Sequence, residues 1–266
     1  MTLAKQHQRH VGGRFSAAAH TYTEASPLQD QVARTVIGMV PEGWRPSSIL
    51  DAGCGPGRLL MLARRRWPES TMVGVDIAAG MIQKARSFFI GDSRATFVEG
   101  DMATFQSPAG FDLIISSSAL HWMRPFAPGL AHVAGQCRAG GFLAVGMMLD
   151  GTLGELREAR EAVAPHKSAP GRLPTLGDVE AVAQSLKGYR VMRIERATEL
   201  YEERTGAGVL RSVHEMGVTG GDVSRGEAPL TRGEIKALAE WYDRHYSTPG
   251  GVRMTFEIGY LLLQRG

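Results

Sequence analysis

Residues 51–57 read Asp-Ala-Gly-Cys-Gly-Pro-Gly and come directly after the short apolar run Ser48-Ile49-Leu50. Glycines at the end of a strand let the backbone turn sharply and approach a ligand closely, because no Cβ is in the way. The dinucleotide fingerprint G-x-G-x-x-G differs, since here the third glycine comes one residue early and Pro56 removes a backbone donor. The stretch predicts a strand followed by a ligand-binding turn, and a tight turn without a ligand is the alternative.

Three further strand-like runs follow the glycine turn, namely Thr71 to Asp76, Thr96 to Met102 and Phe111 to Ser116. The first ends in a carboxylate about 20 residues past the turn, where a mononucleotide fold places an acid for ribose hydroxyls. The second ends in an acid as well, at Asp101. Strand-like runs that alternate with helical segments predict an α/β fold with a doubly wound sheet and its ligand at the carboxyl ends of the strands.

Composition places the chain among ordinary globular proteins. It has 266 residues, of which 43% are hydrophobic and 21% charged, and a net charge of +3. The N-terminus is polar, and no apolar run approaches the length that spans a bilayer, so we expect a cytoplasmic protein without a membrane segment. Two cysteines, Cys54 and Cys137, indicate neither a disulfide framework nor a metal site. The modest charge, without a basic stripe, argues against nucleic acid as a partner.

We expect a single domain over residues 1–266. Residues 1–45 would form N-terminal helices, including a flap at 15–22 and a helix whose apolar face is Leu28, Val32, Val36 and Met39. Residues 46–150 would form the ligand-binding core, with a fifth strand at 142–149 introduced by Gly140-Gly141.

The predicted elements of the second half are helices at 152–164 and 176–186, a sixth strand at 189–201, helices near 206–216 and after Thr231, and a last strand at 253–263. The helix after Thr231 opens with a capping box, since Glu234 follows three residues later. The long excursion at 205–250 is interpreted as a lid insertion before the last strand.

The glycine turn and the acids after it resemble the cofactor site of class I methyltransferases, which bind S-adenosylmethionine. The resemblance implies a seven-stranded, mostly parallel, Rossmann-like sheet with an antiparallel last strand inserted beside the sixth. It implies as cofactor-binding residues Asp51, Gly53, Cys54, Gly55, Gly57, Asp76, Ile77, Asp101, Met102 and Ser117. S-adenosylhomocysteine would be the product.

Within that resemblance, the backbone of 53–57 would face the methionine part of the cofactor, and Asp51 would orient the loop and the ammonium. Asp76 would accept from both ribose hydroxyls, Asp101 from the adenine amino group, and the backbone of Met102 would contact the ring. The alternatives are a solvated strand end or a helix N-cap for Asp76, and a plain turn for Asp101.

The segment Ser116-Ser117-Ser118-Ala119-Leu120-His121-Trp122 follows the fourth strand, where this fold places the transferable methyl group. Its small residues permit close approach, and Trp122 can wall a pocket. A general-base role for His121 is weighed against a structural role, which we favour. A carboxylate acceptor would need no base, because it is ionised at neutral pH. Such a site does need a cation to orient the acceptor, and arginine is the usual choice.

Several stretches resemble malonyl-acyl-carrier-protein O-methyltransferases of biotin synthesis: residues 15–22 with 28–33, residues 51–57, Ala119-Leu120-His121-Trp122, residues 151–156 and residues 255–260. This resemblance implies methylation of the free carboxyl of a malonyl thioester carried on acyl carrier protein or on coenzyme A. Tyr22 and Trp122 match pocket positions, with core packing as the alternative. Arg157 and Arg172 are candidates for binding the carboxylate, and surface positions are the alternative for both.

Other readings stay open at this point. Trp67-Pro68-Glu69-Ser70 and Val73-Gly74-Val75-Asp76 also resemble trans-aconitate methyltransferases, which esterify a small free acid. Another small-molecule methyltransferase is possible, as is a protein that binds S-adenosylmethionine without catalysis. We expect a monomer, and a mildly basic pI of about 9.0 agrees with an acidic carrier protein as partner.

Overall fold

The computed structural model describes residues 12–13, 15–16, 27–167, 173–216 and 228–266. The chain divides into two compact units, and each is described by itself: Met1–Met147 with Thr175–Arg196 and Gly259–Gly266, and Met148–Pro174 with Ala197–Ile258. The prediction of a single domain over 1–266 stays a prediction. Tyr22, Arg172, most of the predicted flap and the first residues of the predicted N-terminal helices lie outside the described residues.

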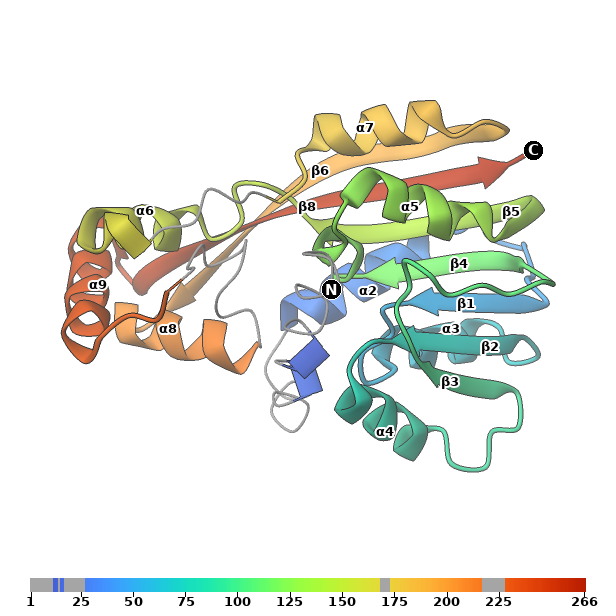
Figure 1. Ribbon diagram of the computed structural model, residues 1–266, viewed down its shortest axis with the longest axis horizontal. Coiled ribbons are helices and arrows are strands. Elements are labelled where there is room, and N and C mark those ends of the chain that lie inside the picture. Colours follow the sequence, from blue (N-terminus) through green and yellow to red (C-terminus); the bar gives the residue numbers. More distant parts are fainter. Residues whose placement is uncertain (1–11, 14, 17–26, 168–172, 217–227) are drawn as a thin grey trace. The chain divides into compact units, whose positions relative to one another are not determined.

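A mostly parallel sheet is the centre of the fold (Figure 1). Its strands, within the described residues, are β1 (Ser48–Ala52), β2 (Thr71–Asp76), β3 (Ala95–Glu99), β4 (Phe111–Ser117), β5 (Cys137–Met148), β6 (Tyr189–Glu203), β7 (Ser247–Thr248) and β8 (Gly251–Arg265). They lie in the order β3-β2-β1-β4-β5-β8-β6, with β7 paired to β8. β8 runs opposite to β1 and β4. The doubly wound sheet and the antiparallel last strand beside the sixth are therefore confirmed, and β7 is a short addition.

The parallel register brings the carboxyl ends of the strands to one edge of the sheet. Asp51 in β1 pairs with Gly74 in β2, and Asp76 at the end of β2 pairs with Glu99 at the end of β3. The middle residues of β4, Leu113 to Ile115, are fully buried. Continuous apolar strands of this kind are typical of a parallel sheet that is covered on both faces.

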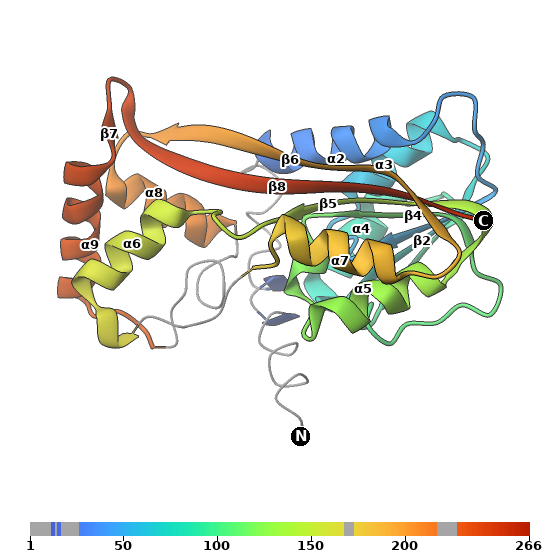
Figure 2. The ribbon, with the colours of Figure 1, turned by 90° about the horizontal axis from the view of Figure 1, so that it is seen from above.

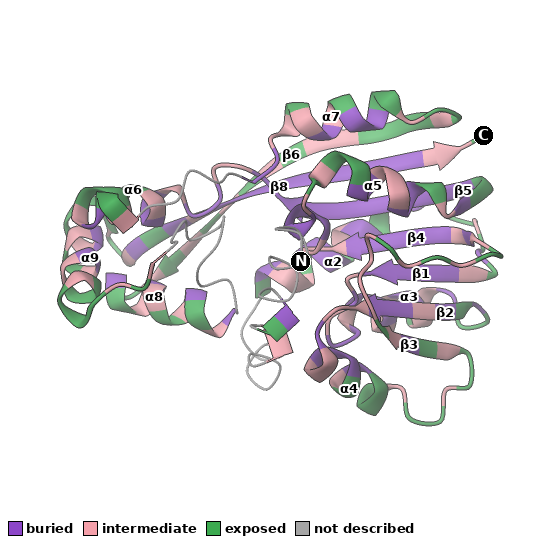
Figure 3. Ribbon diagram, viewed as in Figure 1, coloured by how far each residue is buried: buried purple, intermediate pink, exposed green. Residues whose placement is uncertain are grey.

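Helices cover both faces of the sheet in the first unit. They are α2 (Pro27–Met39), α3 (Arg58–Arg66), α4 (Ala79–Phe88), α5 (Phe126–Gly135) and α7 (Leu176–Ser185), and a single 3₁₀ turn, η1 (Leu120–Trp122), follows β4. Figure 2 shows α2 and α3 on one face and α5 and α7 on the other. The predicted apolar face of α2 is confirmed, since Leu28, Val32, Val36 and Met39 are all buried. Figure 3 shows that β1, β4, β5 and β8 are buried over much of their length.

The second unit holds α6 (Gly154–Val163), the 3₁₀ turn η2 (Pro165–Lys167), α8 (Gly206–Glu215) and α9 (Arg232–His245). The predicted capping box is present at the start of α9, where Thr231 accepts from the Glu234 backbone N–H and the Glu234 carboxylate accepts from the Thr231 N–H. α9 packs against α6 and α8. Tyr242 of α9 is fully buried, and its hydroxyl donates to the Arg253 carbonyl at 2.7 Å. Among the described residues, no helix is long and apolar enough to cross a bilayer.

Two strand boundaries differ from the sequence prediction by more than two residues. β5 begins at Cys137 and not at Phe142, because Gly140 and Gly141 lie inside the strand. Glycine within a strand marks a bulge or a close backbone approach, and here a Cβ on Gly141 would lie 2.5 Å from the Asp112 carbonyl oxygen. β3 ends at Glu99 and not at Met102, so Asp101 and Met102 belong to the turn after the strand.

Gly146 of β5 sets how closely α2 approaches the sheet. A Cβ there would lie 2.6 Å from Cγ1 of Val32 and 3.0 Å from Cγ2 of Val36. Gly146→Ala is therefore expected to lower the free energy of unfolding by about 1–3 kcal/mol through overpacking, measured by urea denaturation. Gly38→Ala on α2 is the matched control, because a Cβ there meets nothing within 4 Å. Equal stability of the Gly146→Ala variant and the native protein would contradict this packing.

Candidate functional site

The glycine turn after β1 needs glycine at its bends. Gly53, Gly55 and Gly57 have φ of +78°, +51° and +88°, values that residues with a Cβ rarely adopt. The N–H groups of Gly53 and Cys54 both donate to the Val75 carbonyl of β2, at 2.8 and 3.0 Å. A Cβ on Gly53 would lie only 2.3 Å from that of Ala119. The turn is thus fixed against β2 on one side and against the segment after β4 on the other.

Asp76, the last residue of β2, holds the glycine turn in place. Its Oδ2 accepts from the Gly55 N–H at 2.8 Å, and its Oδ1 accepts from the Ala78 N–H at 2.9 Å. Burial raises the pKa of this carboxyl, and the hydrogen bonds from Ala78, Gly55 and Ile77 oppose that rise. The carboxylate therefore both orders the turn and lines the pocket beside it.

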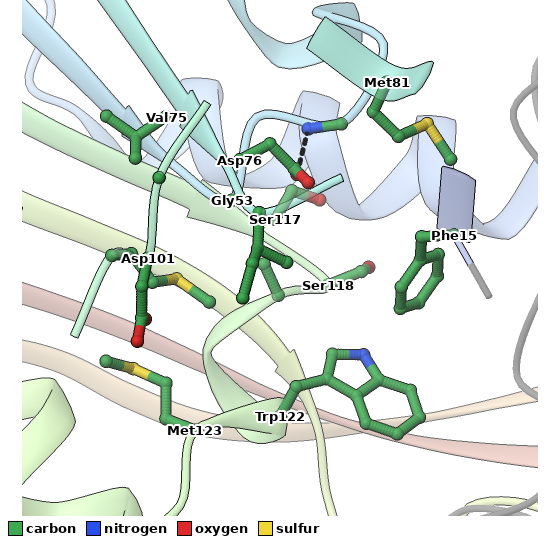
Figure 4. A pocket seen from close by; sticks show the side chains of 15 residues that line it. Phe15, Gly53, Val75, Asp76, Met81, Asp101, Ser117, Ser118, Trp122 and Met123 are labelled. Carbon is green, nitrogen blue, oxygen red and sulfur yellow. Dashed lines mark hydrogen bonds between the residues drawn. The ribbon is translucent and has the colours of Figure 1, made fainter. Parts of the chain in front are cut away.

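A pocket lies at this edge of the sheet (Figure 4). It is mostly apolar, and its charged residues within the described chain are the two carboxylates Asp76 and Asp101. Phe15 and Trp122 contact each other edge to face, with ring centroids 5.8 Å apart. The lining residues are Phe15, Gly53, Gly55, Val75, Asp76, Ile77, Met81, Gly100, Asp101, Met102, Ser117, Ser118, Ala119, Trp122 and Met123.

Asp101 takes part in a turn and also lines the pocket, and its role toward the adenine stays a prediction. Its Oδ1 accepts from the Ala103 N–H at 2.8 Å, which is a turn interaction, and the residue also lines the pocket. Met102 follows it in the same lining. A carboxylate at this place can accept from an exocyclic amine, because each of its oxygens has more than one acceptor position.

Asp51 is fully buried, and neither of its carboxylate oxygens has a hydrogen-bond partner among the residues that the structure describes. Burial raises its pKa well above the ordinary value, and the nearby charge of Asp76 raises it further. An unpaired buried carboxylate is costly, so a cationic ligand group would stabilise it. Asp51 lines a second pocket, which shares Gly53, Gly55, Ser117 and Ser118 with the first.

These features fit S-adenosylmethionine on physical grounds. Its ammonium would satisfy Asp51, its adenosine would lie in an apolar pocket that carries Asp76 and Asp101, and the glycine turn leaves room for close approach. The individual residue roles stay predictions. They agree with the pocket linings for most of the predicted cofactor residues: Gly53, Gly55, Asp76, Ile77, Asp101, Met102 and Ser117 line the first pocket, and Asp51 and Cys54 the second. Gly57 is the N-cap residue of α3.

The segment after β4 is fixed tightly. Ser118 has a φ of +56°, unusual for a residue with a Cβ, and its N–H donates to the Gly146 carbonyl at 2.8 Å.

His121 is buried, and it is not among the residues that line either pocket. Burial lowers the pKa of its imidazole to about 3, and the nearby Arg124 charge adds to that effect. A neutral imidazole with this pKa is a poor general base, which favours the structural role.

The described substrate candidates belong to different units of the chain. Trp122 lines the first pocket. Arg157 belongs to the second unit, where its Nη1 lies 3.4 Å from Oδ1 of Asp150. Tyr22 and Arg172 lie outside the described residues. Sequence reasoning missed Met81 and Met123, two pocket-lining methionines that a pattern cannot distinguish from ordinary core residues.

Asp76→Ala is expected to weaken binding of S-adenosylhomocysteine by about 1–3 kcal/mol, because ribose hydroxyls and the Gly55 N–H would lose their acceptor. Isothermal titration calorimetry measures the change. Glu99→Ala is the matched control, since Glu99 ends the neighbouring strand in register with Asp76 but is exposed and outside the pocket lining. If Asp76→Ala binds as tightly as the control, Asp76 does not hold the ribose.

Comparison with solved structures agrees with this architecture. The chain is similar to the geranyl diphosphate C-methyltransferase of Streptomyces coelicolor, solved with S-adenosyl-L-homocysteine, at a TM-score of 0.54 over 90% of this chain and 80% of that one. The two sequences are 13% identical, so this likeness concerns the fold.

Comparison with protein families and curated sequences goes further. Residues 49–141 match a methyltransferase domain family. The chain is 31% identical to the trans-aconitate 2-methyltransferase of Afipia carboxidovorans over 130 residues, 49% of each chain. It is 30% identical to the malonyl-acyl-carrier-protein O-methyltransferase of Salmonella typhimurium over 251 residues, 93% of this chain and 95% of that one. With this identity over nearly the whole length of both proteins, the chain belongs to the malonyl-acyl-carrier-protein O-methyltransferase family and is an S-adenosylmethionine-dependent methyltransferase.

Proposed function

We propose that this enzyme methylates the free carboxylate of a malonyl group carried on acyl carrier protein, an early step of biotin synthesis. The observation that carries the proposal is the 30% identity to the Salmonella enzyme over 93% of this chain, which extends well beyond the cofactor-binding half. Four further relatives of the same name are 26–30% identical to this chain over 87–94% of its length.

Methylation of a carboxylate requires no general acid or base from the protein. When bound, S-adenosylmethionine would supply an electrophilic methyl group on a sulfonium, and its transfer to a carboxylate oxygen would break the C–S bond, leave the electron pair on sulfur and move no proton. Malonate-type carboxyls are ionised at neutral pH, so the acceptor is ready without a base. The low pKa and the burial of His121 are consistent with such a reaction.

The chain would then contribute mainly position and a dry pocket. Asp76 would hold the ribose hydroxyls, and Asp101 with the Met102 backbone would hold the adenine. Trp122 and Phe15, in contact with each other, would exclude water beside the small residues Ser117 to Ala119. Holding the two reactants in line and excluding water can supply most of the rate for a reaction between opposite charges.

The acceptor end is less closely defined. Tyr22, Arg157 and Arg172 remain candidates for orienting the malonyl carboxylate, and residues 205–250 for a lid over it. The partner would be the acidic acyl carrier protein, and a net charge of +3 with a pI of about 9.0 is compatible with it. We expect a cytoplasmic monomer.

Esterification of a small free acid is the second candidate function. It is favoured by the 31% identity to the trans-aconitate 2-methyltransferase of Afipia carboxidovorans. That similarity covers 49% of each chain, against 93% and 95% for the Salmonella relative. The broader similarity therefore places the malonyl thioester first.

Transfer of labelled methyl from S-adenosylmethionine to malonyl-acyl-carrier-protein tests the acceptor directly. Malonyl-coenzyme A and trans-aconitate are run beside it, and acetyl-acyl-carrier-protein, which lacks the free carboxyl, is the matched control. We expect label on the malonyl thioesters that mild ester hydrolysis releases, and none on the acetyl form. Label on trans-aconitate alone would overturn the malonyl proposal and favour the second candidate.

His121→Gln is expected to keep most of the activity, because a carboxylate acceptor needs no base. For the same reason the rate should show no inflection near pH 6.5 from this residue, since the pKa of His121 is lowered to about 3. Steady-state kinetics of both proteins across the neutral pH range check this. A loss of activity beyond about a hundredfold, with thermal stability unchanged, would assign His121 a general-base role.

A further inference from the structure

The second pocket lies next to the predicted cofactor pocket and has two opposite charges in its lining. Within the described residues its charged lining side chains are Asp51 and Arg58, one anionic and one cationic. Asp51 belongs to β1, which precedes the glycine turn, and Arg58 is the first residue of α3, which follows the turn. The two pockets share Gly53, Gly55, Ser117 and Ser118, so a ligand in the first can extend into the second.

Neither charge is neutralised by the other. Asp51 is fully buried without a hydrogen-bond partner among the described residues. Arg58 pairs with a different carboxylate, since its Nε donates to Oδ1 of Asp30 at 2.9 Å. The other oxygen of Asp30 accepts from Arg34 at 3.0 Å, and both arginines lower the pKa of Asp30. Asp30 thereby fixes the Arg58 side chain through Nε, and the two Nη groups donate no hydrogen bond within the described chain.

A pocket with an unpaired anion and a separate cation fits a zwitterion. We propose that Arg58, held in position by Asp30, binds the α-carboxylate of the cofactor's amino-acid end while Asp51 faces its ammonium. The start of α3 adds to this, because the first N–H groups of a helix favour a nearby anion. This inference deepens the proposed function: it rests on the cofactor and is independent of which acid is methylated.

The proposed role of Arg58 predicts that its substitution affects the affinity for one ligand and not for another. Arg58→Gln is expected to weaken binding of S-adenosylhomocysteine about 10- to 100-fold, as for a lost hydrogen bond to a charged group. It should leave binding of 5′-methylthioadenosine unchanged, because that ligand keeps the adenosine and the sulfur but lacks the amino-acid end. Calorimetric titration of both ligands against each variant measures this difference.

Arg34→Gln is the matched control. It also removes an arginine paired with Asp30, but Arg34 is not among the residues lining the pocket and its side chain is 62% exposed. We expect it to bind both ligands as the native protein does. Asp51→Asn, a second variant, should weaken S-adenosylhomocysteine and spare 5′-methylthioadenosine.

Three results would overturn the assignment. The first is Arg58→Gln binding S-adenosylhomocysteine as tightly as the native protein, the second is an equal loss of affinity for both ligands, and the third is an equal loss of S-adenosylhomocysteine affinity in the Arg34→Gln control. Equal loss of both ligands would show that Arg58 supports the glycine turn and does not contact the amino-acid end. A failure of the proposed function is distinguishable, since absence of label on malonyl thioesters would leave the ligand-dependent pattern of Arg58→Gln intact.

Discussion

The hydrogen bond from the Gly55 N–H to the Asp76 carboxylate, 2.8 Å long, joins the turn after β1 to the end of β2, and the site depends on it. Without an acceptor at this place, a turn with three left-handed glycines would have many conformations of similar energy. With it, the same carboxylate that faces the pocket also determines the shape of the pocket wall. Loop order and part of the pocket lining are thus carried by one side chain.

Burial of titratable side chains is the second general property of the site. Asp51 and Asp76 are both enclosed, and burial raises the pKa of each, while it lowers the pKa of His121. Each shift disfavours the charged form of its own group. This edge of the sheet is therefore strongly desolvated, and a cationic ligand group would stabilise the buried carboxylate of Asp51. A buried, neutral His121 makes the edge poorly suited to proton transfer.

Much of this could be predicted from the sequence because the decisive signals are local. Glycines 53, 55 and 57 and the acid at 76 stand at fixed places after apolar runs, and the bounds of β2 agree with the prediction at both ends. The start of β5 was missed because a Gly-Gly pair, normally a break, lies here inside a strand where Gly141 must pass close to Asp112. Met81 and Met123 were missed for a different reason, since only tertiary packing separates a pocket wall from a core. The substrate arginines are long-range features, and no local pattern identifies them.

The contact between Gly53 and Ala119 has a consequence for how this family can vary. The methyl group of Ala119 occupies the space that a Cβ at position 53 would need, 2.3 Å away. Any enlargement at either position is therefore felt at the other, although the two belong to different strand–loop units of the chain. A side chain at position 53 would therefore require the loss of the methyl group at position 119 at the same time. The floor of the pocket is thus determined jointly by one residue after β1 and one after β4.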